Sequence, residues 1–387
     1  MWNINENAIA NQDPKSTARI KVIGLGGAGC NTISRLHALQ LSGVELIAAN
    51  TDRQCLHANP AANKILLGAN LTRGLGSGGD PQIGQAAAEQ SYRELIAAMR
   101  DCDLLFLTAG MGGGTGSGAI QIAARIAKSL DIPSMSFVTV PFTFEAGKRQ
   151  QNAREAVARL QPFTDTLVTI PNDRLLNLAG ADATLQSAFG LSDDILIKGI
   201  QALSEMLGTS GLVNIDLSHV LRLIKNGGGT FISLGYGQGD GRAIRAIENA
   251  LSHPLLEDIP ISQSKGMIVK FSGAITVTEM QAAMSYLQSR TSPDTEILPT
   301  LNSQERPDGQ VLVTLLATGI GATAVEYAPL PVENPAELPH ELEPSALPMD
   351  FCPHAFDPAD KDIDDLEVPA FIRRGYNQIN NLNYRNG

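Results

Sequence analysis

The sequence predicts an α/β protein in which a parallel sheet covered by helices is followed by a long helix and a smaller α/β domain. Three observations indicate this architecture. Short apolar runs typical of buried strands alternate with segments of helical spacing, and short loops join them. Two clusters of glycines each stand directly between a strand run and a helix. A stretch of helical composition at 184–207 separates the first set of strand runs from the second.

The composition fits a globular protein of two ordinary domains, since the chain has 387 residues and 43% of them are hydrophobic. No apolar run approaches the roughly 18 residues that suggest a membrane span. Residues 1–17 lack the apolar segment of a secretory signal. The four cysteines form no CxxC pair, which argues against a disulfide framework and against a zinc site. We therefore expect a cytoplasmic protein with reduced cysteines.

The acidic excess of the chain is concentrated in one segment. The formal net charge is −11. Between Pro331 and Glu367 there are eleven acidic residues and one lysine, so this segment alone carries −10 (1 − 11). The remainder is close to neutral, which argues against a nucleic-acid surface. The segment is also rich in proline and poor in aromatics, and both features are typical of an extended linker.

The expected elements follow from the order of apolar runs and helical spacings. Gly190 and Gly199 interrupt the long central helix at a tolerable cost of about 1 kcal/mol each. Strands are expected at 20–23, 44–49, 103–109, 134–140, 166–170, 230–234, 265–271 and 310–317, and helices at 31–41, 83–100, 119–130, 184–207, 218–225, 242–251 and 277–289. The resulting domains are a disordered leader at 1–17, a first domain at 18–183, a central helix at 184–209, a second domain at 210–327, a disordered acidic linker at 328–361 and a C-terminal tail at 362–387.

The first glycine cluster is Gly24-Leu25-Gly26-Gly27-Ala28-Gly29, which stands after a strand and before a helix. Its G-x-G-x-x-G spacing matches the dinucleotide fingerprint. Glycines allow close approach of the backbone, and amide N–H groups at a helix N-terminus receive phosphate. Asp52, at the end of the second strand, could serve as a ribose-binding acid. The motif therefore predicts phosphate binding and leaves an NAD-linked dehydrogenase open.

The second glycine cluster closes most of that opening. It runs from Gly112 to Gly118, and it places six glycines in nine positions counted from Gly110. Amides of such a loop can wrap a polyphosphate, and Thr115 and Ser117 add hydroxyls. A dehydrogenase needs no second phosphate loop of this kind in the same sheet. The absence of GK[ST] anywhere in the sequence excludes a Walker-type NTPase.

The GGGTGSG run resembles the signature loop of tubulin, and the chain as a whole resembles the prokaryotic cell-division tubulin homologue FtsZ. The resemblance runs from about residue 20 to residue 321 and recurs near the C-terminus. It implies a tubulin-like, Rossmann-type GTPase domain that a long central helix joins to a smaller C-terminal polymerisation domain. Its landmarks in this sequence are GLGGAGCN, NTD, GLGSGGDP, GGGTGSG, PFTFEAGKR, IPNDRLL, AFG, GLVNIDLSHV, PLLED and ATGIG.

The resemblance also implies a GTP/GDP site. Glu145 and Arg149 would lie near the ribose and phosphates. Asn172 and Asp193 would read the guanine base, on which Phe189 would stack. The residues that would line the phosphates are Gly27, Ala28, Gly29, Cys30 and Asn31 in the first loop, with Asn50 after the second strand, and Gly112, Gly113, Gly114, Thr115, Gly116 and Ser117 in the second loop.

The main departure from the family lies in the segment that the family inserts into the nucleotide site of the next subunit. The family reads N-x-D-F-x-D-V there, and its two aspartates polarise the attacking water and help to hold a cation. Here Asn214 and Asp216 are retained, but His219 replaces the second aspartate. The resemblance therefore implies a GTPase that uses Mg²⁺ and the catalytic residues Asn214, Asp216 and His219. The loss of one negative charge at position 219 leads us to expect slow hydrolysis.

The C-terminal segment from Asp364 to Arg374 resembles the family's short docking peptide for membrane adaptors and division regulators. Its apolar residues form an island after the acidic linker, as expected of a segment that folds into a partner's groove. Neither nucleic acid nor direct membrane insertion is expected.

The function implied is that of a GTP-dependent, filament-forming GTPase of cell division, acting at the division site, whose subunits stack head to tail. Two other functions stay open. A divergent paralogue would bind GTP and co-polymerise with a second FtsZ while hydrolysing little, and His219 favours it. An NAD-dependent oxidoreductase is disfavoured by the second glycine loop.

Overall fold

The computed structural model describes residues 18–145, 147–174, 184–208, 217–225, 229–253, 261–303 and 309–320. The leader, the acidic linker and the docking peptide expected from the sequence lie outside these residues.

The described strands form one continuous ten-stranded sheet in the order β3-β2-β1-β4-β5-β6-β7-β10-β8-β9. The pairs from β3 to β7 are all parallel. Beyond them, β10 runs antiparallel to β7 and to β8, and β9 runs parallel to β8. The strands are β1 Ile20–Leu25, β2 Val44–Asn50, β3 Asn63–Leu66, β4 Leu104–Gly110, β5 Ser134–Val140, β6 Thr166–Pro171, β7 Gly229–Gly237, β8 Gly266–Ser272, β9 Glu296–Asn302 and β10 Val311–Ile320.

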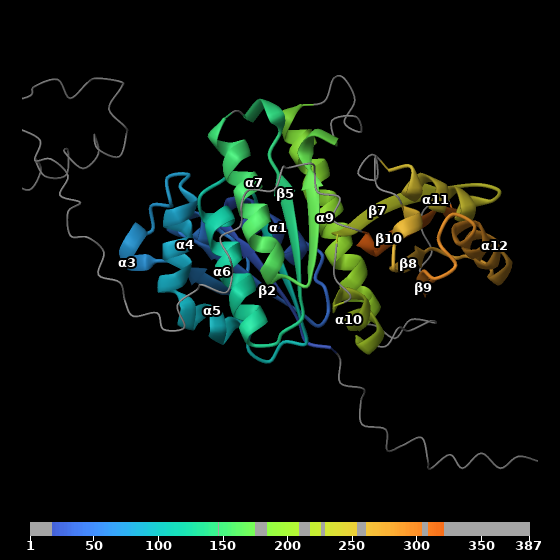
Figure 1. Cartoon of the computed structure of the whole chain (residues 1–387), viewed down its shortest axis with the longest axis horizontal. Helices are drawn as coiled ribbons and strands as arrows, with labels where there is room; N and C mark the ends of the chain where they lie inside the picture. Colours follow the sequence, from blue (N-terminus) through green and yellow to red (C-terminus); the bar gives the residue numbers. More distant parts are fainter. Residues whose placement is uncertain are drawn as a thin grey trace, which may run out of the picture. The chain divides into compact units, whose positions relative to one another are not determined.

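Helices cover both faces of the parallel part, so its strands are buried on both sides. Phe106 of β4 packs on the face that α1 and α9 cover, and Leu107 packs on the face that α4 to α7 cover. Helices α4 and α6 lie side by side, as do α11 and α12 (Figure 1). The helices are α1 Gly26–Ala38, α2 Arg53–Ala58, α3 Ala69–Thr72, α4 Pro81–Gln90, α5 Tyr92–Met99, α6 Thr115–Ser129, α7 Lys148–Leu160, α9 Leu185–Gly208, α10 Leu217–Lys225, α11 Arg242–Leu251 and α12 Val277–Gln288.

The junction between the two halves of the sheet is the pairing of β6 with β7. Among the described residues, these strands pair at two positions, Leu167 with Gly229 and Val168 with Thr230. Helix α9 packs against β7 beside this junction. A Cβ at Gly199 would stand 2.5 Å from Cδ1 of Ile232, so glycine at this position allows the close approach of helix and strand.

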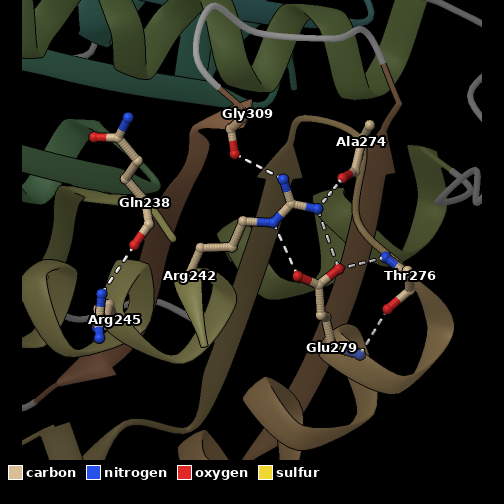
Figure 2. A network of polar contacts seen from close by, with 7 residues as sticks. All are labelled: Gln238, Arg242, Arg245, Ala274, Thr276, Glu279 and Gly309. Carbon is tan, nitrogen blue, oxygen red and sulfur yellow. Dashed lines mark hydrogen bonds and ion pairs between the residues drawn. The ribbon is translucent and has the colours of Figure 1, made fainter. Parts of the chain in front are cut away.

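A network of partly buried polar contacts joins α11 and α12 to two neighbouring loops. Arg242, at the start of α11, donates to both carboxylate oxygens of Glu279 on α12, at 2.8 and 3.2 Å. It also donates to the carbonyls of Gly309 and Ala274, and Glu279 accepts from the backbone N–H of Thr276 as part of a capping box (Figure 2). One guanidinium thus joins α11, α12 and two loops.

The fold class expected from the sequence is confirmed: a mostly parallel sheet, a long helix over residues 185–208 and a second α/β part. Two helices begin earlier than predicted, since α1 starts at Gly26 and α6 at Thr115, inside the glycine clusters. Five of the helices and strands given above were not predicted, namely β3, β9, α2, α3 and α7. Among the described residues, no helix is long and apolar enough to cross a membrane.

Candidate functional site

The two glycine clusters meet at the carboxyl edge of two neighbouring strands. Strands β1 and β4 are parallel partners, with Leu25 opposite Ala109. Helix α1 follows β1 at once, and α6 follows β4 after a short loop, so both helix N-termini lie at the same edge of the sheet. Crevices outside the carboxyl ends of parallel strands are where open α/β sheets bind ligands.

Most of the glycines in these clusters allow the loops to pack on each other. A Cβ at Gly26, whose φ is +73°, would stand 2.7 Å from the backbone N of Gly116. A Cβ at Gly110 would stand 2.7 Å from Cβ of Ala28. Since real Cβ contacts are longer than this, a side chain at either position would force the loops apart.

Gly27 and Gly113 are different, because a Cβ at either position would meet nothing within 4 Å. Neither residue has a positive φ. One lies in the first loop and the other in the second, and Gly27 is exposed. At one point in each loop, neither a side chain nor a neighbouring atom covers the backbone. A phosphate can therefore approach the amides closely at these two points.

Neither helix N-terminus at this edge is capped by a side chain. The N-cap residues are Leu25 for α1 and Gly114 for α6, and no side-chain oxygen bonds to the first amides of either helix. These N–H groups, together with the positive end of each helix dipole, are suited to a phosphate. The donors present thus fit the polyphosphate that the sequence predicts.

The hydroxyls of the second loop are already engaged in the protein. Thr115 Oγ1 shares hydrogen bonds with Thr51 Oγ1 at 2.6 Å and with Ser77 Oγ at 3.0 Å. The backbone N–H of Gly112 donates to Ser117 Oγ at 2.9 Å. These hydroxyls therefore stabilise the conformation of the second glycine loop through contacts within the protein. Thr51 and Ser77 were not among the predicted site residues, although both lie in the motifs NTD and GLGSGGDP.

The residues after β2 pack against the first loop. Asn50 is buried, and its Nδ2 donates to the Sγ of Cys30 at 3.8 Å. Asn31 is exposed in the second turn of α1. The carboxylate of Asp52 accepts from the amides of Gln54 and Cys55 and so caps α2. Both of these bonds go to Oδ1 of the carboxylate.

Glu145 and Arg149 form an ion pair, with 2.9 Å between Oε2 and Nη1. Glu145 is nearly buried, with a side chain 11% exposed, and also accepts from the N–H of Phe142. Arg149 is 57% exposed. The second glycine loop touches this turn, because a Cβ at Gly112 would stand 2.7 Å from the carbonyl oxygen of Arg149. Arg149 thus borders the loop with its guanidinium in solvent.

The predicted base-reading residues lie at two elements. Asn172 follows β6 directly and is buried. Asp193 lies on α9 with its side chain 20% exposed, and its Oδ2 stands 3.7 Å from Nη2 of Arg35 on α1. Burial raises the pKa of Asp193 above its ordinary value, and Arg35 acts in the opposite direction. The side chain of Phe189 lies outside the described residues.

The catalytic segment is described in part. Asn214 and Asp216 lie outside the described residues. His219 lies in α10 and is exposed, while Val220, Leu223 and Ile224 turn the other face of this helix into the core. His219 therefore presents itself to solvent. Within the part of the chain that is described, no group of three or more His, Cys, Asp or Glu side chains could hold a metal ion.

Two family models match the chain. The model described as "Tubulin/FtsZ family, GTPase domain" matches residues 19–180, and "FtsZ family, C-terminal domain" matches residues 228–321. Cell division protein FtsZ 1 of Pyrococcus horikoshii is 38% identical over 335 residues, which cover 86% of this chain and 88% of the relative. Cell division protein FtsZ of Neisseria meningitidis serogroup A is 36% identical over 395 residues, which cover 97% and 98%.

Solved structures agree with these matches. An empty FtsZ dimer of M. jannaschii superposes with a TM-score of 0.75 at 37% identity, covering 81% of this chain and 91% of that one. CetZ2 from Haloferax volcanii, solved as a GTPgS-bound protofilament, superposes with a TM-score of 0.66 at 20% identity, covering 79% and 94%. The second likeness shows the shared fold alone.

Proposed function

The chain belongs to the tubulin/FtsZ family of GTPases, and from this premise we propose that it is a cytoskeletal GTPase of cell division that polymerises with GTP. The observation that carries the proposal is the pair of bare glycines, Gly27 and Gly113, at the edge of the sheet where two uncapped helices begin. A triphosphate held between these loops would receive amides from both of them.

The base would be read by Asn172 and Asp193. An ionised carboxylate accepts from both N1–H and N2–H of guanine, and adenine offers no matching pair of donors. Asp193 is partly open to solvent and lies beside α1. The N-termini of α1 and α6, with their two glycine loops, form what we call the phosphate cradle. Phe189, four residues earlier on the same helix, would stack on the base.

Near the ribose and phosphates, the exposed guanidinium of Arg149 would face the ligand, while its ion-pair partner Glu145 is held by the backbone of Phe142. Mg²⁺ bound with the triphosphate would neutralise charge on the phosphate oxygens. The carboxylate we assign to that ion is Asp216 of the next subunit in the filament.

Hydrolysis would take place between stacked subunits. Asn214, Asp216 and His219 of one subunit would face the nucleotide of its neighbour, where Asp216 orients the attacking water. The exposure of His219 supports this arrangement, because a residue that serves a neighbouring subunit must point away from its own core. A heterologous contact of this kind does not close and therefore generates a filament.

A second candidate function is a paralogue that binds GTP and joins the filament of a second FtsZ with little turnover. The observation that favours it is the exposed imidazole at position 219, where the family carries a carboxylate. An NAD-linked oxidoreductase is not supported, because the first domain matches the GTPase domain of the tubulin/FtsZ family.

We assign the segment 364–374 to adaptors and division regulators, and the site of action to the division plane. Both assignments rest on the resemblance of that segment to the family's docking peptide.

Two measurements on the purified full chain test the proposal. The nucleotide released by denaturation identifies the ligand, for which we expect GDP or GTP, whereas NAD would refute a GTPase. Turnover per subunit as a function of protein concentration separates the two candidates. A shared active site gives turnover that rises steeply above a critical concentration together with light scattering. A paralogue that needs a second FtsZ shows bound nucleotide with negligible turnover at every concentration.

A further inference from the structure

Two cysteine thiols lie beside the first glycine loop, although they are 25 residues apart in the sequence. Cys30 follows the loop in the second turn of α1, and Cys55 lies in the first turn of α2. Their side chains interact with each other. The side chain of Asn50, whose Nδ2 donates to the Sγ of Cys30 at 3.8 Å, also interacts with the thiol of Cys55. Cys30 is 1% exposed, and Cys55 is half-buried. Only Cys55 is therefore open to a reagent from solution, with Cys30 directly behind it.

The two helices that carry these thiols are held together at a second point. Nδ2 of Asn59, just after α2, donates to the carbonyl oxygen of Cys30 at 2.7 Å and to Ser34 Oγ at 3.0 Å. This contact fixes the end of α2 against the first turns of α1. The two helices are thus fixed against each other beside the cysteines, which keeps the two thiols close together.

The two thiols also differ in acidity. Hydrogen bonds from the thiol of Cys30 and from the side chain of Asn50 lower the pKa of Cys55 to about 6. The contact with Cys55, followed by burial, raises the pKa of Cys30. Burial and the neighbouring charge of Asp52 oppose the effect on Cys55 without cancelling it. The lowered pKa favours the thiolate on Cys55, which is also the more exposed member of the pair.

We propose that Cys30 and Cys55 form a reversible redox pair that takes a low-molecular-weight disulfide, such as oxidised glutathione, as its substrate. This inference goes beyond GTP binding and does not depend on it. The Cys55 thiolate attacks one sulfur of the reagent, forms a mixed disulfide and releases one thiolate. The Cys30 thiol then loses its proton and displaces the second glutathione, which leaves the Cys30–Cys55 disulfide. Two protein thiols are oxidised, and one glutathione disulfide is reduced to two thiols.

Cys102 provides a control within the same chain. It is also partly buried, but burial raises its pKa to about 11, and it donates to the carbonyl of Leu104 at 3.0 Å. A thiol of this kind carries little thiolate at neutral pH. Cys102 should therefore react slowly with the same reagent.

The test is the reaction of the reduced full-length protein with oxidised glutathione at pH 7, followed by alkylation and peptide mass spectrometry. We expect a cross-linked peptide pair that contains Cys30 and Cys55 in the parent and in Cys102→Ser, and its loss on addition of dithiothreitol. In Cys30→Ala, a mixed disulfide should accumulate on Cys55, because the resolving thiol is gone. In Cys55→Ser, Cys30 should remain unmodified.

The parent alone can overturn the proposal, so the result does not depend on a variant that folds. Cys30 and Cys55 recovered as separate alkylated peptides, at an oxidant dose that fully modifies an unfolded sample, would refute the pair. Modification of Cys102 as fast as Cys55 would likewise show that the site has no special reactivity. A mixed disulfide that persists on Cys55 of the parent would refute Cys30 as the resolving thiol.

Discussion

Arg35 of α1 and Asp193 of α9 form an ion pair across the contact between these two helices, with 3.7 Å between Nη2 and Oδ2. Arg35 also reaches Asp194, at 3.3 Å. Helix α1 begins in the first glycine loop. Arg35 therefore connects the helix that starts at the phosphate cradle with Asp193, the carboxylate that we assign to guanine. Burial raises the pKa of Asp193 even though Arg35 acts against this shift. The ionised carboxylate therefore lowers the stability of the folded protein.

Asp193→Asn should therefore lower the affinity for GTP without lowering the free energy of unfolding. A raised pKa in the folded state contributes stability at acid pH, and this contribution is lost as the pH rises through the raised value. A neutral amide removes that loss, so we expect the free energy of unfolding at pH 7 to be no lower than in the parent. Affinity for GTP should fall by roughly 1–3 kcal/mol, because a charged acceptor is lost. Urea unfolding and calorimetric titration measure the two quantities, and unchanged GTP affinity would remove the assignment.

The glycines of the two loops should divide into two classes. Gly27→Ala and Gly113→Ala place a methyl group in open space, so we expect the free energy of unfolding to change by less than about 1 kcal/mol while GTP affinity falls. In Gly116→Ala the methyl would stand 2.7 Å from the carbonyl oxygen of Gly110, and we expect destabilisation of about 1–3 kcal/mol. Thermal unfolding with and without GTP distinguishes the classes. Full GTP binding by both open-position variants would place the phosphates elsewhere.

His219→Asp should raise GTP turnover of the polymerised protein, because it restores a fixed negative charge beside the water that attacks in the neighbouring subunit. Help from a general base is typically worth about 10²–10⁴-fold, which bounds the gain. GTP affinity of the monomer should not change, since the residue acts on another subunit's nucleotide. The matched control is Ser218→Asp, which adds the same charge at the adjacent exposed position of α10. Equal turnover in the parent and in His219→Asp would make His219 a spectator.

Glu279→Gln should destabilise the second half of the protein in a pH-dependent way. Hydrogen bonds from Arg242, with help from Thr276, lower the pKa of Glu279 to about 2. A lowered pKa contributes stability above the ordinary value, and this contribution is lost as the pH falls toward 2. We expect a loss of about 1 kcal/mol at pH 7, discounted for partial exposure, and almost none at pH 2. Arg245→Ala is the control, because Arg245 donates only to the carbonyl of Gln238 in Figure 2. An equal loss in both variants would contradict a specific clamp.

Removal of residues 328–387 should leave GTP-dependent polymerisation intact and abolish recruitment by a membrane adaptor. The last described strand, β10, ends at Ile320, before the proposed linker begins. Sedimentation of the truncated protein with GTP checks the first part, and co-sedimentation with adaptor-coated vesicles checks the second. Failure of the truncated protein to polymerise would assign the tail to the assembling unit.

The sequence was sufficient for the central strands and for most helices, because buried parallel strands leave continuous apolar runs. Strand β5 and helix α11 have the predicted bounds. The edges of the sheet were missed for physical reasons. Strand β9 contains Pro299, which argues against a strand, but β9 is the last strand of the sheet and pairs only with β8, so the missing N–H is tolerated. Strand β3, at the other edge, is short and largely polar.

The starts of α1 and α6 could not be read from propensity. Glycine is a poor helix former, so the glycine clusters were predicted as loops that precede each helix. In the structure the first turns of both helices are built from these glycines, because tertiary contacts such as that of Gly26 with Gly116 outweigh the local preference. The ion pair of Arg35 with Asp193 joins residues 158 positions apart, and no local pattern encodes it. The sequence motifs were sufficient to locate the candidate site. How the two loops pack on each other could be seen only in the structure.

The order of the strands in the sheet bears on how the protein is made. The six strands from β3 to β6 in the sheet are also the first six in the chain, and they are complete once Pro171 has been synthesised. Both glycine loops belong to this segment. On the ribosome, the phosphate cradle can therefore form while the second half is still being translated, as domains that fold in order of synthesis do. Until β7 emerges, one edge of the nascent sheet, strand β6, is unpaired and exposed to other chains. Guanine nucleotide in the cell would then stabilise an unfinished chain before it can take part in any filament.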